Sequence, residues 1–191
     1  MRWNQLFSDL EQQFDDELDA GPRERRILEE RSRIAALTLR DRLLRAPRSL
    51  DLVLHNGERL QLHRRSIGKD WCNGTISGGG PIEAAAIVRL PAIERILFDE
   101  SGILDSLNDT RAREIGAAGR VSFANVLRDL CRRRSFVDIR GVVNATGTID
   151  RVGADHLDLA VHEPGTPRTR RHLQHTAVIR LDSIAWVCLN D

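Results

Sequence analysis

The sequence predicts an α+β protein, in which an N-terminal helical segment precedes two small five-strand β-barrels, each led by a helix. Three observations predict this class. Apolar residues recur at helical spacing over residues 1–46. Short alternating runs separated by turn residues then fill residues 47–98. Elements of that region return in the same order within residues 122–191, which indicates a duplication.

The composition supports a packed core and excludes several classes of protein. Of 191 residues, 41% are hydrophobic and 30% charged. The 29 basic and 28 acidic side chains nearly cancel, which excludes a uniformly basic nucleic-acid binder. No apolar run approaches the roughly 18–20 residues of a membrane span, and no apolar signal core opens the chain, so we expect no membrane partner.

The three cysteines are an odd number and are widely spaced. Cys72, Cys131 and Cys188 each lie beside apolar residues and form no Cys-x-x-Cys pair. We interpret them as small buried hydrophobes in a reducing compartment. The sequence therefore predicts a cytoplasmic protein.

Residues 1–46 predict helices of opposite charge. Residues 1–20 carry a net charge of −5 and an apolar stripe, whereas residues 21–48 carry +5. Pro22 is suited either to the first turn of a second helix or to the kink of one long rod, so a helical hairpin and a kinked helix both remain open. The stripe needs a covering surface, which predicts a second copy or another protein as partner.

Residues 47–98 predict the first barrel. Asn56 and Gly57 lie between two alternating runs, and both tolerate the positive φ of a type I′ hairpin turn. A second turn follows at residues 68–71, and Pro91 marks a tight corner between the last two strands. Five short strands leave exposed edges in an open sheet, so we expect them to close into a barrel.

The second copy follows a linker at residues 99–121 and occupies residues 122–191. The copies share Gly-x-Asp at residues 68–70 and 153–155, and Arg-Leu-x-x-Ile at residues 89–93 and 180–184. An N-capped helix beginning at Ser122 leads the second copy. This copy is longer by six residues within the loop-like segment 164–172.

These elements together resemble the Sm-like (Lsm/Hfq-type) small β-barrel family, over roughly residues 22–98 and 122–190. In that family Asp, Asn and Arg positions line a pocket for an RNA base. The resemblance implies such positions at Asp70, Asn73, Arg89, Asp155 and Arg180. The second copy departs from the family at the Asn position, which is Asp158. The chain also resembles an uncharacterised protein family of high-GC bacteria.

Basic loops and two ring side chains predict further contacts with nucleic acid. Arginines supply phosphate contacts, and exposed rings stack on unpaired bases. The predicted residues are Arg64, Arg65, Trp71, His156, Arg168, Arg170 and Arg171. For Trp71, simple filling of the core stays an open alternative. We therefore predict a non-catalytic protein that binds nucleic acid, single-stranded RNA above all.

No pattern predicts catalysis, a cofactor or a metal. The glycine run at residues 78–80 lacks the Lys-Ser/Thr pair of a phosphate loop, and His172 and His175 lack a third metal ligand. No Ser or Cys lies in a glycine-rich nucleophile turn. The alternative to nucleic-acid binding is a scaffold for protein interaction or self-assembly that uses residues 1–46.

Overall fold

The computed structural model describes residues 21–77, 84–108 and 117–189. The chain divides into two compact units, Met1–Asp41 and Arg42–Asp191, and each is described by itself. The acidic helix predicted for residues 1–20 lies outside the described residues, as does the glycine run at 78–80, so the hairpin and the kinked rod both stay predictions. Along the described part of the chain, no helix has the length and apolar character needed to cross a bilayer.

The first unit contains helix α2 (Pro22–Ala35), which begins at the proline as predicted. The predicted basic helix continues to Pro47, whereas α2 ends at Ala35 and the chain leaves the helix at residues 36–38. The backbone N–H of Gly21 donates to Glu24 Oε2 over 2.9 Å and so satisfies one free donor at the helix start. Arg33 pairs with Glu30 one turn earlier, and this hydrogen bond lowers the pKa of the Glu30 carboxyl. No residue of α2 is buried.

A short helix, α3 (Leu39–Arg45), spans the boundary between the units. Thr38 and Asp41 cap its start reciprocally: the Asp41 N–H donates to Thr38 Oγ1, and the Thr38 N–H donates to Asp41 Oδ2. Leu43, on the part of α3 that belongs to the second unit, is fully buried in that unit's core. The capped first turn of α3 therefore belongs to the first unit, which ends at Asp41.

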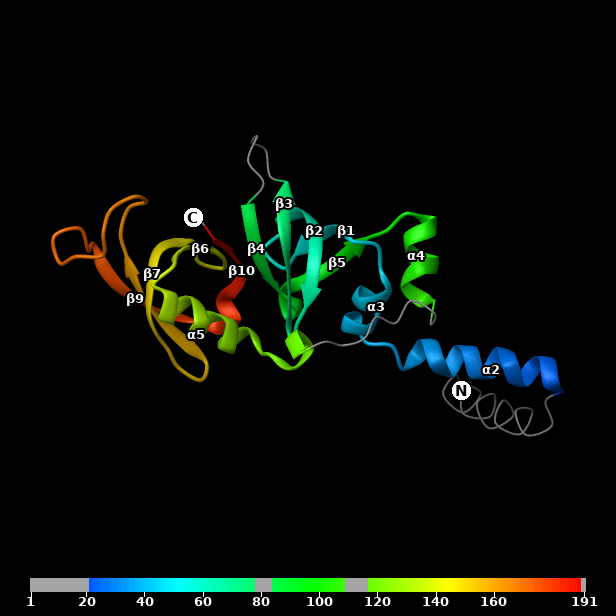
Figure 1. Ribbon diagram of the computed structural model, residues 1–191. Helices are drawn as coiled ribbons and strands as arrows, with labels where there is room; N and C mark the ends of the chain where they lie inside the picture. The colour runs from blue at the N-terminus through cyan, green and yellow to red at the C-terminus, as the bar shows by residue number, and fades with distance from the viewer. Residues whose placement is uncertain (1–20, 78–83, 109–116, 190–191) are drawn as a thin grey trace, which may run out of the picture. The chain divides into compact units, whose positions relative to one another are not determined.

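The second unit is built on ten antiparallel strands in one sheet, in the order β5-β1-β2-β3-β4-β10-β6-β7-β8-β9 (Figure 1). The strands are β1 (Ser49–Leu54), β2 (Arg59–Ile67), β3 (Trp71–Ser77), β4 (Ala84–Arg89), β5 (Ile93–Leu97), β6 (Phe136–Gly141), β7 (Ala145–Val152), β8 (His156–Val161), β9 (His175–Arg180) and β10 (Ile184–Leu189). The α+β class is confirmed.

The prediction of two closed barrels is wrong. The sheet does not close on itself, because β4 of the first half pairs with β10 of the second, with Val88 opposite Trp186 and Ala86 opposite Cys188. This pairing gives each half a hydrogen-bonded neighbour at one edge. The exposed edges that closure was expected to remove are covered there by the other half of the chain.

The two halves repeat each other in strand order and in register. Each runs fifth, first, second, third and fourth strand across the sheet. Each has a bulge between its second and third strands, at Arg64–Ser66 and at Ile149–Arg151. The Gly-x-Asp turns form the same bonds, since the Leu90 N–H donates to the Asp70 carbonyl and the Leu181 N–H donates to the Asp155 carbonyl. The shared sequence elements therefore occupy equivalent positions.

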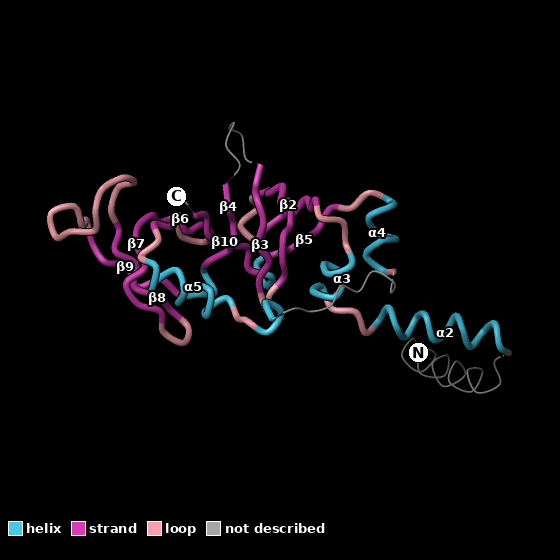
Figure 2. Tube along the Cα trace, viewed as in Figure 1, coloured by secondary structure: helices cyan, strands magenta, loops and turns pink. Residues whose placement is uncertain are grey.

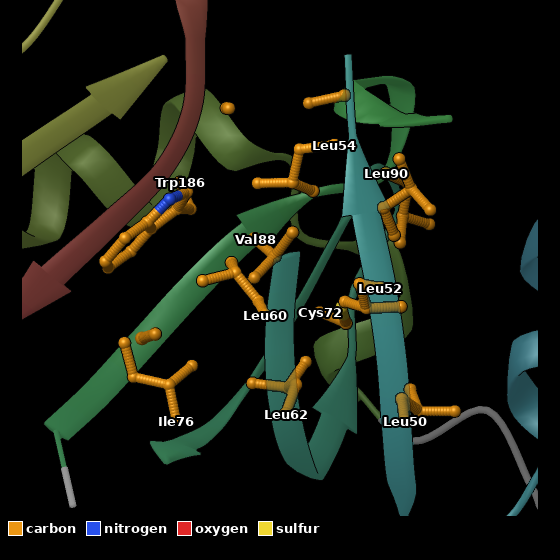
Figure 3. Packing of buried hydrophobic residues seen from close by; sticks show 14 of the residues in the cluster. Leu50, Leu52, Leu54, Leu60, Leu62, Cys72, Ile76, Val88, Leu90 and Trp186 are labelled. Atoms are coloured by element: carbon orange, nitrogen blue, oxygen red, sulfur yellow. The ribbon is translucent and has the colours of Figure 1, made fainter. Parts of the chain in front are cut away.

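Two hydrophobic cores draw on both halves. Figure 3 shows the first core, in which Trp186 from β10 lies with Val88 and Leu60 of the first half. The second core contains Ile87 of β4 among residues of the second half. Because successive residues of a strand point to opposite faces, β4 supplies Val88 to one core and its neighbour Ile87 to the other. Neither core is complete without the other half.

Helices cover parts of this sheet unit (Figure 2). α5 (Phe123–Arg133) packs its apolar face on the second core, and Ser122 caps it by accepting from the Asn125 N–H. The helix ends at Arg134, which adopts the left-handed conformation with φ 58°. In the predicted linker, α4 (Glu100–Leu107) begins at Asp99, whose Oδ1 accepts from the Gly102 N–H over 2.7 Å.

Candidate nucleic-acid interface

The Gly-x-Asp turn of the second half is open to solvent. His156 and Arg180 are register partners on β8 and β9, and the His156 ring donates from Nδ1 to Asp155 Oδ1 over 2.8 Å. Arg180 is 75% exposed and pairs with Asp182 in the following 3-10 turn (Leu181–Ser183). Asp155, His156, Arg180 and Asp182 form what we call the open turn cluster.

Ion pairs and hydrogen bonds lower the pKa values of the two carboxyl groups of this cluster. The hydrogen bond from His156 lowers the pKa of Asp155, and the nearby Arg180 charge adds to that effect. The hydrogen bond from Arg180 likewise lowers the pKa of Asp182, which also feels the charge of Arg89 from the first half. The structure thus brings Arg89 and Arg180, both predicted contacts, toward one acidic residue that the sequence analysis had not singled out.

The equivalent turn of the first half is covered. Asp70 Oδ1 accepts from the Phe123 N–H over 2.7 Å, and the Lys69 N–H donates to the Val121 carbonyl. The Trp71 indole N–H donates to the same carbonyl over 2.9 Å, and its ring is buried. Residues leading into α5 therefore seal this turn, and Trp71 fills the core rather than offering a face to a base.

Two more predicted contacts of the first half are engaged inside the protein. Arg64 is buried, and its Nη2 donates to the Ala46 carbonyl over 2.9 Å. Its register counterpart in the second half is Ile149, a core residue, so the guanidinium occupies a core position. Asn73 Oδ1 accepts from both the N–H and the hydroxyl of Ser66, at the bulge. The neighbouring Arg65 is exposed on β2.

The loop between β8 and β9, residues 162–174, lies largely at the surface, and we call it the arginine loop. Arg170 and Arg171 are exposed, and Arg168 binds Asp150, whose carboxylate raises the pKa of the guanidinium. Arg134, at the end of α5, reaches the other oxygen of Asp150 over 3.5 Å. Sequence reasoning missed Asp150 because its ion pairs with Arg134 and Arg168 join separate parts of the chain, and alternation does not reveal such contacts. Asp182 lies only two residues after Arg180, so the local spacing of an arginine and an aspartate could have found that pair.

Other chemistry has little support in the described residues. Among them, no three His, Cys, Asp or Glu side chains gather where a metal ion would be held. His172 Nδ1 lies 3.0 Å from Thr169 Oγ1 within the loop. The three cysteines are free thiols, Cys72 and Cys188 buried and Cys131 partly so. Burial raises the pKa of Cys72 to about 12, which keeps its thiol protonated.

Comparisons with known protein families, with curated proteins and with solved structures find no match to this chain. The candidate interface therefore stands on its geometry.

Proposed function

We propose that the protein binds single-stranded nucleic acid, RNA in the first place, on the open turn cluster and the arginine loop of its second half, and that it catalyses no reaction. One observation carries the proposal. Two turns with the same backbone bonds differ in exposure: α5 and its lead-in seal the first, whereas Asp155, His156 and Arg180 stay accessible in the second. The repeated halves support the duplication on which the Sm-like resemblance rests, although its closed barrels do not form.

Among the exposed groups, the guanidinium and imidazole side chains have the chemistry that such a ligand requires. Guanidinium groups at Arg170 and Arg171 form charge-assisted hydrogen bonds with phosphate oxygens, and Arg180 adds its Nη1 donors beside the pair that its Nε and Nη2 form with Asp182. The His156 ring, about half exposed, offers a face on which an unpaired base stacks. Binding through these few groups is expected to be weak and to weaken further with salt, because each phosphate contact releases counterions.

Fluorescence anisotropy with a labelled oligouridylate of roughly 12 nucleotides tests this function. Replacing Arg170 and Arg171 with Gln is expected to reduce the slope of log K against log salt by about 1.4, at about 0.7 per lost contact. The charge-matched control replaces Arg132 and Arg133, which pair with Asp129 on α5, and is expected to keep the slope. Absence of binding below about 100 μM, or equal losses in both variants, contradicts the proposal.

A second function, self-assembly through the sheet edges, is favoured by a different observation. In the described part of the chain, β5 pairs only with β1 and β9 only with β8. These edges are the counterparts of β10 and β4, which pair with each other inside the molecule. Val178 on β9 is 70% exposed, whereas its counterpart Ile87 on β4 is 5% exposed and covered by β10. Light scattering on the full chain tests this function, and a monomer at all concentrations contradicts it.

A further inference from the structure

A pocket of about 810 Å³ opens on the second half, beside the arginine loop. Phe136 of β6, Thr148 of β7 and His162, which directly follows β8, line its inner side. Arg134 and Arg168 stand at its charged side, and the turn at residues 164–167 forms the rest of its lining. The pocket is separate from the open turn cluster and contains no residue of it.

Hydrogen bonds within the protein fix the residues of the inner wall. His162 is 3% exposed, with Thr148 Oγ1 at 2.9 Å from Nε2 and the Glu163 carbonyl at 3.2 Å from Nδ1. Because a carbonyl oxygen only accepts, Nδ1 is the donor in the contact with Glu163, and Nε2 forms a hydrogen bond with the Thr148 hydroxyl. The Phe136 ring meets the His162 ring edge to face, with centroids 5.2 Å apart and planes at 64°.

The charged side carries a net charge of +1. Arg134 and Arg168 both contact the carboxylate of Asp150, which is largely buried on β7. Two guanidinium groups thus share one carboxylate, and one positive charge remains uncompensated within this trio. The left-handed conformation of Arg134 ends α5 and turns the chain into β6, at whose start Phe136 lies. An apolar ring and an excess cation therefore lie in one pocket.

Among the described residues, the first half has no counterpart of the aromatic wall of this pocket. Phe136 pairs with Thr148 in the register at which Ser49 pairs with His63 in the first half, so the aromatic wall residue is replaced there by a small polar one. The turn that completes the pocket belongs to the six-residue extension of the second copy. The aromatic wall and the turn that complete this pocket are therefore features of the second half.

We propose that this pocket binds one unpaired nucleotide of the strand, with the base against Phe136 and its phosphate at Arg134 and Arg168. This inference rests on the proposed function and deepens it. One nucleotide of a single strand pairs a planar ring with one negative charge, which matches the ring and the excess charge of the pocket. Arg170 and Arg171 continue along the same loop and are placed for the neighbouring phosphates.

The test compares two strands of equal length, an oligouridylate of roughly 12 nucleotides and a base-free ribose-phosphate chain. Phe136→Leu keeps an apolar side chain but removes the ring face. It is expected to weaken binding of the oligouridylate about fivefold or more, and to leave binding of the base-free strand unchanged. Phe98→Leu, at a half-buried phenylalanine of the first half, is the matched control and is expected to change neither.

Thermal unfolding verifies that each variant folds, and Arg168→Gln gives a second measurement through an exposed group. This variant is expected to lower the salt slope by about 0.7 on both strands. Equal effects of Phe136→Leu on both strands, or no effect on either, contradict the proposal that the pocket binds a nucleotide. In that case, binding of the oligouridylate by the unchanged protein still supports the proposed function. Displacement of the strand by free uridine monophosphate at concentrations below the strand's own Kd assigns the pocket to free nucleotides instead. A wild-type protein that binds neither strand overturns both proposals.

Discussion

Cys72 shows how burial alone sets the chemistry of one side chain. It lies in the first core, where burial raises the pKa of its thiol from 9.0 to about 12. Since the thiolate is the reactive form, we predict that Cys72 resists alkylation in the native protein and reacts only after unfolding. Mass spectrometry of protein treated with iodoacetamide, with and without denaturant, measures this.

The same pKa predicts how stability depends on alkaline pH. Below 9.0 the thiol is protonated in both states; above it the unfolded chain loses the proton that the native state keeps, so the free energy of unfolding falls. The limiting slope is about 1.4 kcal/mol per pH unit. The chain has no Tyr, which leaves few other groups to titrate there. Burial also raises the pKa of Cys188, which contributes a slope of the same sign. Urea unfolding of Cys72→Ala is therefore expected to show a reduced slope, and an identical slope in both proteins contradicts the assignment.

At the scale of elements, the contact between Asp70 and the start of α5 joins a turn of the first half to a helix of the second. The Asp70 carboxylate accepts from the Phe123 N–H, one of the donors that a helix start leaves unpaired. We predict that Asp70→Ala lowers the free energy of unfolding by about 0.5–2 kcal/mol, whereas Asp70→Asn, which keeps an acceptor, costs less. Urea unfolding measures both variants.

The repeat supplies the control for this prediction. Asp155 is the register counterpart of Asp70, but its carboxylate is exposed and bonds only His156 among the hydrogen bonds described. Asp155→Ala is therefore expected to change stability by less than about 0.5 kcal/mol. A loss as large as that of Asp70→Ala would show that both carboxylates stabilise their own turns, and that the bond to α5 has no separate effect.

At the scale of the whole molecule, the β4–β10 pairing predicts how copies would join. If β9 of one copy pairs with β5 of the next, Val178→Arg places a charge in that contact and shifts the assembly toward monomers. Val142 is 71% exposed, nearly the same as Val178, but lies in the turn between β6 and β7, so Val142→Arg is the matched control. Sedimentation at several concentrations distinguishes the variants, and equal behaviour of the two contradicts edge pairing.

Much of the fold was predictable because its signals are local. The Asn-Gly hairpin, the Gly-x-Asp turns and the Arg-Leu-x-x-Ile elements lie where the sequence placed them, and their spacing predicted the repeat. The type I′ turn predicted for the hairpin is wrong, because Gly57 has a positive φ of 81° but Asn56 does not. Barrel closure was not predictable. Alternation identifies a strand and its faces, but it says nothing about which distant strand covers each edge. The pairing of Val88 with Trp186 is a contact of that distant kind.

The candidate interface was predictable where residues lie in loops. Arg170 and Arg171 are exposed as their loop composition indicated. Trp71 is buried and donates to the Val121 carbonyl, and Arg64 is buried and donates to the Ala46 carbonyl. Both partners lie far along the chain, so no local sequence pattern could have predicted these contacts. His162 was missed because a single histidine at a strand end resembles an ordinary core residue.

Because β4 and β10 each contribute to both cores, the protein is expected to reassemble after a break in its chain. A cut within residues 99–121 would leave two fragments, one lacking Trp186 in its core and the other lacking Ile87. Each fragment holds the strand that the other needs, so reassociation would restore both cores at once. The two halves therefore behave as complementing fragments of one folding unit and not as two independent domains.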